Sequence, residues 1–514
     1  MDVFLALLPI LVVLVLLIFR RTAADLAGLV GWALTLFIAA IFFNTPLRVS
    51  LNASLAGVVA SFPITLMVAA SILQITLMLE SGAVARIVAL IKTVSPGNQV
   101  VQIMIVNIGA GTLLAALGAT PVSILPPVML ALGYSSFVAI ALPALGYDAL
   151  CTYALLGIPV VVFSNFTGQP VEVVGEYFAR YMPVISTCIA LGMIWIVGGW
   201  KLVRRGWLAA LAAGLTAGFI AIGMNALHMV TLTGVAAGLG VILVMLLYLR
   251  LTKQPLVDRS NLTEADRASE QSMPLWRALS PWLILVAFAA LVNTPILPFF
   301  DLTFNRLALP ITIIPDAPEK TRLFWQAYFW ILVSTLLALP ILRTSRSQIR
   351  VSLKKWSKRA PRPMLASAVF FAIAYILNHS GKGLDWQLTD PANNMVTVVA
   401  ETAAQGLGRL YALAAPFLGL LGGFVSGSEA SAIAMLTKLH LSTAEKIGAL
   451  GLLLAAASGI GAGLASVISP AKLQNASASI DRIGEEGSVL RTTFVVSLVI
   501  TAVCALMTLF WAFS

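Results

Sequence analysis

Apolar stretches long enough to cross a lipid bilayer recur along almost the whole chain. The first, FLALLPILVVLVLLIF at residues 4–19, carries no charged side chain, and about 20 such residues span the hydrocarbon core as a helix. Hydrophobic residues make up 60% of the 514 and charged residues only 10%, whereas soluble proteins carry about 25% charged residues. A membrane barrel would instead alternate apolar and polar residues in segments of about ten, and this pattern is absent from the sequence. We therefore expect one all-α polytopic membrane protein.

Short polar loops divide the apolar sequence into separate spans. The first span is interpreted as a retained membrane helix rather than a signal peptide, because Arg20 and Arg21 follow the apolar stretch instead of preceding it. An amphipathic segment at 84–97 and a long apolar block at 99–163 separate the early spans from the later ones. The expected spans are residues 3–19, 24–43, 53–79, 182–200, 206–225, 228–249, 279–293, 323–342, 363–378 and 488–512.

The net charge of +11 is interpreted as a membrane feature and not as a nucleic-acid surface. Lys and Arg collect in the loops that stay on the cytoplasmic side of a membrane. If the N-terminus lies outside, the basic residues of 86–92, 201–205, 250–277 and 343–362 all fall inside, provided that block 99–133 enters the membrane and returns to the same side. The count therefore predicts a re-entrant hairpin at 99–133.

Two distant segments share one order of features. Residues 111–159 and 419–470 each contain an apolar limb, a polar tip, an apolar return limb, a short turn and a long helix of small residues that ends near a proline. The first tip (residues 118–121) reads GATP, and the second tip (residues 426–429) reads SGSE. Because the two hairpins open from opposite sides, we interpret them as an inverted repeat with broken membrane helices, the signature of secondary transporters. The alternative is a chance likeness between small-residue helices.

The repeat divides the chain into five expected parts. They are 1–98, first-half scaffold helices; 99–200, the first hairpin and transport repeat; 201–362, scaffold helices with basic loops; 363–409, second-half scaffold with an amphipathic segment; and 410–514, the second hairpin and transport repeat.

The tips and helix breaks are the candidate binding site for an anion. Irregular backbone survives at membrane depth only beside protein or a watery cavity, and helix N-termini present free N–H groups and positive dipole ends to anions. The alternative is that these small polar residues only permit close helix packing. The candidate substrate-binding residues are Thr120, Ser123, Ser164, Asn165, Ser426, Gly427, Ser428, Ser469 and Gln474.

Two carboxylates inside apolar segments are the candidates for cation coupling. Burying Glu429 or Asp148 in a membrane is expensive, so each is a functional candidate by default. Either could carry a proton or help to coordinate Na⁺, and Asp148 could equally be a structural hydrogen-bond partner. We place no Lys or Arg near either tip, which disfavours a dicarboxylate substrate.

Enzyme chemistry finds no support in the motifs. The three histidines, at 228, 379 and 440, are scattered, and the three cysteines lie in apolar segments without metal-ligand spacing. The glycine-rich strings at 214–218, 234–238 and 459–463 are interpreted as helix packing seams. We therefore expect no catalytic residues, no metal and no cofactor, and leave an intramembrane enzyme or scaffold as a distant alternative.

The chain resembles the L-lactate/glycolate permease family over roughly 84–210 and 408–512. The similarity is carried by the stretches IKTVSPGNQVVQIMIV, ALGYSSFVAIALPALGYDALCTYALLGIPVVVFSNFTG, FVSGSEASAIAML and SVISPAKLQNASASIDRIGEEGSVLR. The resemblance implies a secondary active transporter of the bacterial inner membrane that moves a short 2-hydroxy monocarboxylate with protons. It also implies kinship with elevator-type transporters built on paired re-entrant hairpins, and with it a possible homodimer. The alternative is a Na⁺-coupled transporter of another organic anion, such as a dicarboxylate.

The first tip departs from the family pattern. That pattern typically carries a Glu-Gly-Ala-Ala-Gly-Phe-Gly-like stretch, whereas this chain reads AALGATP at 115–121, without an acid. This difference moves the expected coupling role onto Glu429 and Asp148. The expected partners are the small organic anion, membrane lipid and a second copy of the chain, and no nucleic acid is expected.

Overall fold

The protein is a mostly helical, multi-pass membrane protein. The computed structural model describes residues 2–18, 20, 22–93, 98–148, 150–257, 259–260, 262–293, 297–315, 317–482 and 485–514. Within these residues, nine helices are long and apolar enough to cross a membrane, or up to ten if a bent pair counts as one span. Large apolar side chains on several of these helices are exposed, as expected of a surface in contact with lipid: Phe219, Leu243, Leu247, Val499 and Phe510.

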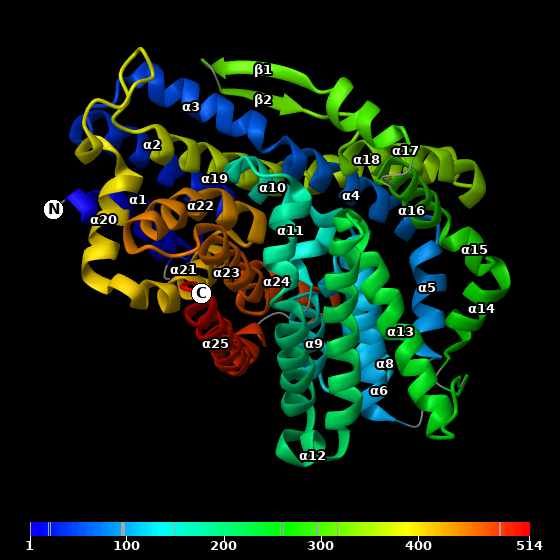
Figure 1. The fold of residues 1–514 in the computed structure, drawn as a ribbon. Helices are drawn as coiled ribbons and strands as arrows, with labels where there is room; N and C mark the ends of the chain where they lie inside the picture. Colours follow the sequence, from blue (N-terminus) through cyan, green and yellow to red (C-terminus); the bar gives the residue numbers. More distant parts are fainter. Residues whose placement is uncertain are drawn as a thin grey trace.

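Among the described residues, positions 2–226 form twelve α-helices and two short helical segments (Figure 1). They are α1 (Asp2–Ile18), α2 (Ala24–Phe42), α3 (Leu47–Ala60), α4 (Phe62–Glu80), α5 (Ala83–Lys92), α6 (Gln99–Ile103), the π-helical η1 (Met104–Ala110), α7 (Gly111–Ala116), α8 (Pro121–Ala131), α9 (Ser136–Asp148), the 3₁₀ turn η2 (Cys151–Tyr153), α10 (Ala154–Thr167), α11 (Val171–Ala179) and α12 (Met182–Ala226).

Residues 230–511 add the remaining helices and a pair of strands. They are η3 (Val230–Leu232), α13 (Thr233–Leu251), α14 (Glu264–Ser272), α15 (Leu275–Ala278), α16 (Ser280–Asn293), η4 (Asp301–Arg306), β1 (Leu309–Ile314), β2 (Ala317–Thr321), α17 (Ala327–Leu342), α18 (Arg346–Arg359), α19 (Pro361–His379), η5 (Pro391–Asn393), α20 (Met395–Leu407), η6 (Gly408–Leu410), α21 (Tyr411–Ser426), α22 (Glu429–Ile447), α23 (Gly451–Leu464), η7 (Ser466–Ile468), α24 (Pro470–Ser479) and α25 (Glu486–Trp511).

The expected single span at 53–79 is wrong. The chain forms two helices there, α3 and α4, which meet at Ser61. Pro63 lies in the first turn of α4, where a proline fits well, but it has no N–H to continue the hydrogen bonds of α3 and its ring clashes with the preceding turn.

Helix α12 folds back on itself, as the separate spans predicted for 182–200 and 206–225 require. Its backbone leaves the helical region at Gly198 and Gly199, and the two halves stand side by side in Figure 1. A Cβ atom on Gly218 would lie 2.2 Å from the Cα of Pro183, and one on Gly214 would lie 2.4 Å from the Cα of Thr187. The glycines at 214–218 therefore form a packing seam, as the sequence predicted.

The expectation of an all-α chain needs one correction. Strands β1 and β2 form an antiparallel hairpin between the expected spans 279–293 and 323–342, and this hairpin lies across the molecule beside α3 (Figure 1). Thr312 is the one polar residue of LPITII, so this short, mostly apolar strand does not stand out beside the long apolar helices.

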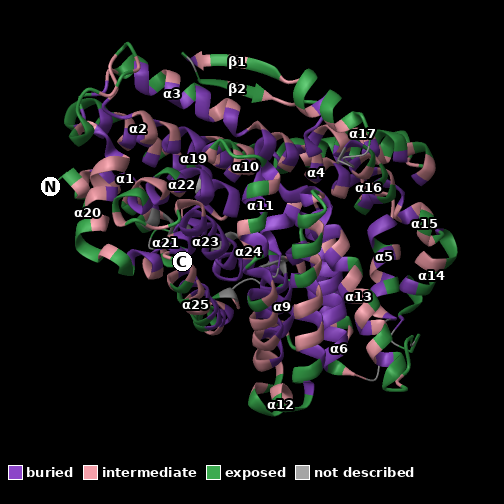
Figure 2. Cartoon of the chain, viewed as in Figure 1, coloured by how far each residue is buried: buried purple, intermediate pink, exposed green. Residues whose placement is uncertain are grey.

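The two segments singled out as a repeat have the same order of elements. Each consists of a helix, a tip, a helix, a second helix, a 3₁₀ turn and a last helix: α7 to α10 in the first and α21 to α24 in the second. The segments also exchange equivalent contacts, because α8 packs on α24 and α10 packs on α22. Helices α22 to α24 lie in the buried centre of the molecule, together with α9 and α6 (Figure 2).

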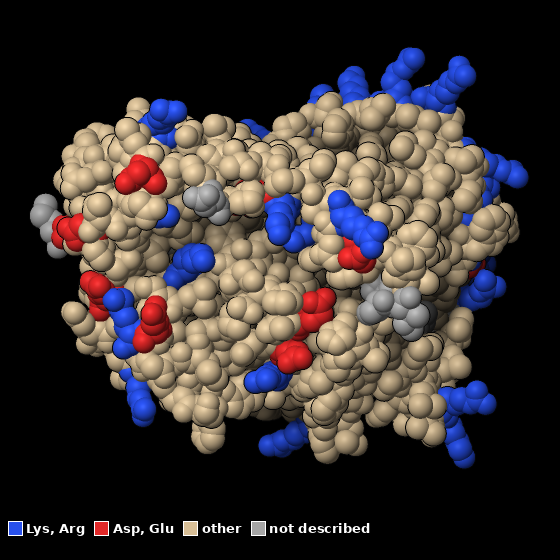
Figure 3. Space-filling view, turned by 45° about the horizontal axis from the view of Figure 1, so that its top comes forward, with Lys and Arg blue, Asp and Glu red and all other residues tan. Residues whose placement is uncertain are grey.

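Three loops that the sequence placed on one side of the membrane lie together in space. Lys92 pairs with Asp266 at 2.8 Å, Arg86 with Glu270 at 3.5 Å, and Lys355 with Glu80 at 2.5 Å. These contacts join helix α5 to helix α14 and the end of α4 to helix α18. In Figure 3, the upper right edge of the molecule carries Lys and Arg without Asp or Glu, whereas both signs of charge mix across the middle of the view.

Candidate functional site

A cavity of about 800 Å³ brings both tips and both helix breaks together. This central cavity is lined by residues 118–120 of the first tip and residues 426–430 at the second tip. Cys151, Ala154 and Leu155 line it at the break between α9 and α10, and Ser469, Lys472 and Gln474 line it at the break between α23 and α24. Residues from four separate parts of the sequence therefore face one space.

The first tip turns tightly before α8. Gly118 has φ +82°, and a Cβ atom there would lie 2.7 Å from the Oγ of Ser71, so the position favours glycine for both conformation and space. Thr120 precedes Pro121, the first residue of α8, and its exposed side chain makes no capping hydrogen bond to the helix. Pro121 has no N–H, so Val122 is the residue whose N–H remains without an acceptor in the first turn.

The second tip is more completely ordered by its own side chains. Gly427 has φ +67°, the Oγ of Ser426 donates to the carbonyl of Gly422 at 2.8 Å, and the N–H of Ser431 donates to the Oγ of Ser428 at 3.3 Å. Ser428 thus caps α22, as Ser does at many helix starts. The N–H groups of Glu429 and Ala430 lie in the first helical turn, where no earlier carbonyl of the helix can accept from them. The positive end of α22 therefore points toward the central cavity.

Glu429 is the buried carboxyl group of the site, with 4% of its surface exposed. The hydroxyl of Thr152 donates to its Oε1 at 2.6 Å, and the thiol of Cys151 also hydrogen-bonds the carboxyl group. Among the described residues, no N–H or O–H donor reaches its other oxygen, Oε2. Residues at η2, the helix break of the first repeat, thus hydrogen-bond the carboxyl group of Glu429 at the second tip.

Lys472 contradicts the expectation that no Lys or Arg lies near either tip. It lines the central cavity, donates to the Oγ of Ser466 at 2.6 Å and attracts the charge of Glu429. The sequence analysis missed it because it belongs to α24 and comes near the second tip only through the break at η7. The rule that ionisable residues in membrane segments are functional candidates would have found it.

Most of the predicted binding residues reach the central cavity, and three do not. Ser123 accepts a hydrogen bond from the Nδ2 of Asn475 at 2.8 Å, which ties α8 to α24 instead of facing the cavity. Ser164 and Asn165 lie near the far end of α10 and line a separate cavity of about 870 Å³, the peripheral cavity. The six that do line the central cavity are Thr120, Ser426, Gly427, Ser428, Ser469 and Gln474, and the coupling candidate Glu429 lines it as well.

Asp148 is the last residue of α9, and its side chain lies outside the part of the chain that the structure describes. Within the described residues, no three His, Cys, Asp or Glu side chains lie close enough to hold a metal ion. Among the described residues, the central cavity is lined by hydroxyls, the amide of Gln474, the thiol of Cys151, one carboxyl group and one ammonium group, and helix N-termini reach it. Together they can bind a small anion and exchange a proton.

The chain matches known permeases along nearly its whole length. The family model described as L-lactate permease covers residues 2–513. Glycolate permease GlcA of Escherichia coli K12 is 26% identical over 99% of this chain and 95% of its own length. The L-lactate permease of the same strain is 25% identical over 98% and 95%, and the L-lactate permease of Bacillus subtilis 168 is 22% identical over 98% and 94%.

Two solved transporter structures are more distantly similar. Neisseria gonorrhoeae MtrF, of a class of antimetabolite efflux pumps, has a TM-score of 0.45 at 14% identity, with 90% of this chain and 84% of that chain covered. The YdaH transporter of Alcanivorax borkumensis has a TM-score of 0.49 at 13% identity, with 95% and 98% covered. At these scores the likeness carries no argument about this chain.

Proposed function

The chain belongs to the L-lactate permease family, and we propose that it carries a small 2-hydroxy monocarboxylate, such as lactate or glycolate, together with a proton. It is a membrane transporter and not an enzyme. The observation that carries the proposal is the pairing of one carboxyl group, Glu429, with one ammonium group, Lys472, in a cavity where helix N-termini converge.

The substrate carboxylate is proposed to bind to Lys472 and to the start of α22. An ammonium group attracts a carboxylate strongly where water is scarce, and the N–H groups of Glu429 and Ala430 add hydrogen-bond donors of the kind that hold anions at helix starts. Ser428 and Ser469 line the same cavity and supply hydroxyl partners for the 2-hydroxy group.

The coupling to protons follows from the count of charges. Without substrate, Glu429 and Lys472 can balance one another. A bound carboxylate takes the attraction of Lys472 for itself, so two negative groups then share one positive group in a site where unpaired charge is costly. A proton on Glu429 restores the balance, and the loaded site is then neutral.

For the movement that carries the substrate across the membrane, we propose the mechanism expected from the sequence. We propose that the two tips belong to inverted re-entrant hairpins, that parts 99–200 and 410–514 move against the scaffold parts in an elevator-like step, and that two chains associate. The shared order of elements in the two repeats supports this reading.

The proposed location is a bacterial inner membrane, with the N-terminus outside and the central cavity open to the cytoplasm. The cavity lining reaches Thr22, Pro363 and Gly487, which are close in sequence to Arg20, Arg362 and Arg482. Arg362 also lies 3.6 Å from Asp25, so the basic ends of α1 and α19 share one face, as the positive-inside bias requires.

A Na⁺-coupled carrier of another organic anion, such as a dicarboxylate, remains the second candidate. Two carboxylates of a substrate would call for more positive charge than one ammonium group supplies. Lys472 is the single Lys or Arg among the described residues that line the central cavity, which favours the monocarboxylate.

The test is uptake of labelled lactate and glycolate into proteoliposomes. An imposed inward proton gradient is expected to drive accumulation, an imposed Na⁺ gradient is not, and succinate is expected to compete poorly. Transport driven by Na⁺ alone would transfer the assignment to the second candidate, and immobility of every small carboxylate under both gradients would exclude the carrier.

The role given to Glu429 has its own test in the same vesicles. Glu429→Gln keeps the shape of the side chain and mimics the protonated acid, so exchange of internal for external lactate is expected to continue while accumulation driven by the proton gradient is lost. A Glu429→Gln protein that still accumulates lactate with the pH dependence of the wild type would refute the role.

A further inference from the structure

Two small cavities lie in a row between the peripheral cavity and the central one. The peripheral cavity shares Glu172, His228 and Phe300 with a cavity of about 10 Å³. That cavity shares Thr231 and Trp325 with another of about 20 Å³. The second small cavity in turn shares Ile158 with the central cavity. The row follows the seam between α10 on one side and η3 with the start of α17 on the other.

Three buried polar atoms face the middle of this row without a partner. They are the hydroxyl of Thr231, the indole N–H of Trp325 and the side-chain carbonyl of Gln326, none of which hydrogen-bonds to a described residue. The exposed fractions of these residues are only 7%, 6% and 4%. Their side chains all line the cavity of about 20 Å³. Buried polar groups in folded proteins are satisfied almost without exception, so three at one place point to a bound ligand.

The size and chemistry of the cavity identify that ligand as water. A bound water needs about 10–15 Å³ and two to four polar partners, and both small cavities meet the volume. The ligand must donate to the carbonyl of Gln326 and accept from the N–H of Trp325, while the hydroxyl of Thr231 can take either role. A metal cation cannot accept a hydrogen bond, so it does not fit. The cavities are too small for a three-carbon acid.

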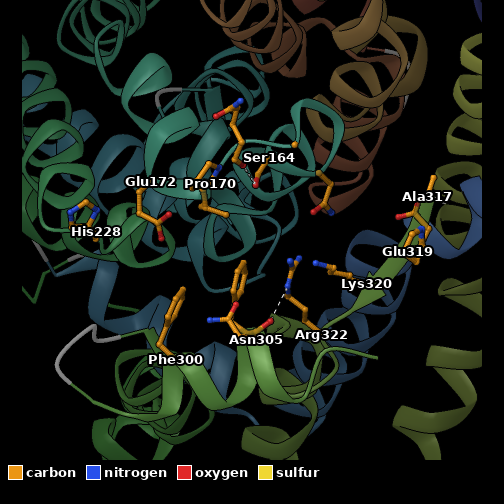
Figure 4. A pocket seen from close by; sticks show the side chains of 16 residues that line it. Ser164, Pro170, Glu172, His228, Phe300, Asn305, Ala317, Glu319, Lys320 and Arg322 are labelled. Carbon is orange, nitrogen blue, oxygen red and sulfur yellow. Dashed lines mark hydrogen bonds between the residues drawn. The ribbon is translucent and has the colours of Figure 1, made fainter. Parts of the chain in front are cut away.

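The peripheral cavity supplies the other end of the row with titratable groups. In Figure 4, Glu172 and His228 lie on one side of it, and Lys320 and Arg322 lie on the opposite side. Glu172 and His228 also line the first small cavity. Thr231 lines that small cavity as well, so the titratable side chains and the unpartnered hydroxyl border one space.

The inner end of the row is closed by apolar side chains at the break of α10. Ile158 is 2% exposed and separates the cavity at Thr231 from the central cavity. It follows three residues with left-handed backbone, Leu155 (φ 55°), Leu156 (φ 55°) and Gly157 (φ 77°), a conformation that costs free energy for leucine and persists only where the surroundings hold it. Gly157 packs directly on Thr231, since a Cβ atom there would lie 3.5 Å from the Cα of Thr231.

We propose that Thr231, Trp325 and Gln326 bind water in the seam and form a route for water and protons, but not for the carboxylate, from the peripheral cavity to the wall at Ile158. The role of this route in transport rests on the proton coupling proposed above. The water site itself is a property of the fold. A closed wall keeps protons from crossing freely while the central cavity is open, so the route delivers a proton only when the break of α10 moves.

Hydroxyl-radical footprinting tests the water site without any transport assay. Radicals produced by an X-ray pulse oxidise side chains next to bound water, even where they are buried. Trp325 is expected to be oxidised several-fold faster than Trp282, which is equally buried at 5% exposure and lines none of the four cavities described here. The Thr231→Val/Gln326→Met double variant should fold, because it removes polar atoms without changing side-chain volume much, and should slow the oxidation of Trp325 toward that of Trp282. Equal oxidation of the two tryptophans in the wild type would overturn the proposal.

Transport by the same double variant tests the route. Accumulation of lactate driven by a proton gradient is expected to slow several-fold, whereas exchange of internal for external lactate continues at the wild-type rate. An equal loss of both activities would assign the residues a structural role and overturn the route. If the wild type exchanges no carboxylate at all, the proposed function has failed, and the footprint still decides the water site.

Discussion

At the scale of single residues, the site brings two charged groups from different helices of the second repeat together with a hydroxyl from the first. Glu429 begins α22 and Lys472 lies in α24, while Thr152 of the first repeat holds the carboxyl group at 2.6 Å. Glu429 could be found from the sequence because it interrupts an apolar stretch. Thr152 could not, because a hydroxyl in a membrane helix has no distinguishing pattern. Lys472 could have been identified as an ionisable residue in a membrane segment, but its place beside Glu429 depends on the break at η7.

Lys472→Gln is expected to weaken substrate binding strongly. The change removes a charge-assisted hydrogen bond to the substrate carboxylate, so the KM for lactate uptake should rise about tenfold or more. Lys438→Gln is the matched control, because Lys438 belongs to α22 but is exposed and lines none of the four cavities. An unchanged KM in the Lys472→Gln protein would remove Lys472 from the binding site.

At the scale of elements, breaks and close glycine contacts decide the architecture. The halves of α12 approach so closely that Gly218 has no room for a Cβ atom beside Pro183. The sequence predicted such seams from the spacing of glycines, and it predicted the order of elements in the two repeats. It did not predict the division of 53–79 at Ser61 or the strands β1 and β2. Pro63 marks the division, but apolar composition alone does not reveal it. The strands pair through backbone hydrogen bonds that apolar composition does not encode.

Gly218→Ala is expected to destabilise the helical hairpin of α12. The added methyl group would overlap the backbone at Pro183, and overpacking of this kind costs about 1–3 kcal/mol. The thermal midpoint of the detergent-solubilised protein, followed by loss of the monodisperse peak in size-exclusion chromatography, should fall. Gly223→Ala in the same half of α12 meets no atom within 4 Å and should leave the midpoint unchanged or raise it. Equal midpoints for the two variants would argue against the close packing of the hairpin.

At the scale of the whole molecule, the charged loops are fastened to one another on one face. Burial tends to raise the pKa of Asp266, but the hydrogen bonds from Lys92 and from the backbone and side chain of Thr263 outweigh it and leave the pKa below the ordinary value of 3.8. A carboxyl group with a lowered folded pKa stabilises the fold above its unfolded pKa, and this contribution disappears as the pH falls through the folded value.

Asp266→Asn is therefore expected to lower stability at pH 7 and to have less effect in acid. The loss at pH 7 should be about 1 kcal/mol, as for a partly buried ion pair with extra hydrogen bonds, and the difference from the wild type should shrink below pH 3.8. Protease digestion of the loop at 250–277 measures it. Asp301→Asn removes an exposed pair with Arg306 and should change nothing measurable. A difference at Asp266 that is independent of pH would refute the ion pair.

The whole architecture also distributes the chemistry unevenly between two similar halves. Both charged groups of the central cavity come from the second repeat, whereas the first tip contributes only the uncharged residues 118–120. On the proposed mechanism, Glu429 and Lys472 of the second repeat handle the proton, and residues of the facing first tip vary more freely. On that mechanism, such a carrier can acquire new substrates by substitutions at Ala119 and Thr120, because Gly118 is fixed by its φ of +82° and by the nearby Ser71; those two codons are the natural target for directed evolution of selectivity with coupling retained.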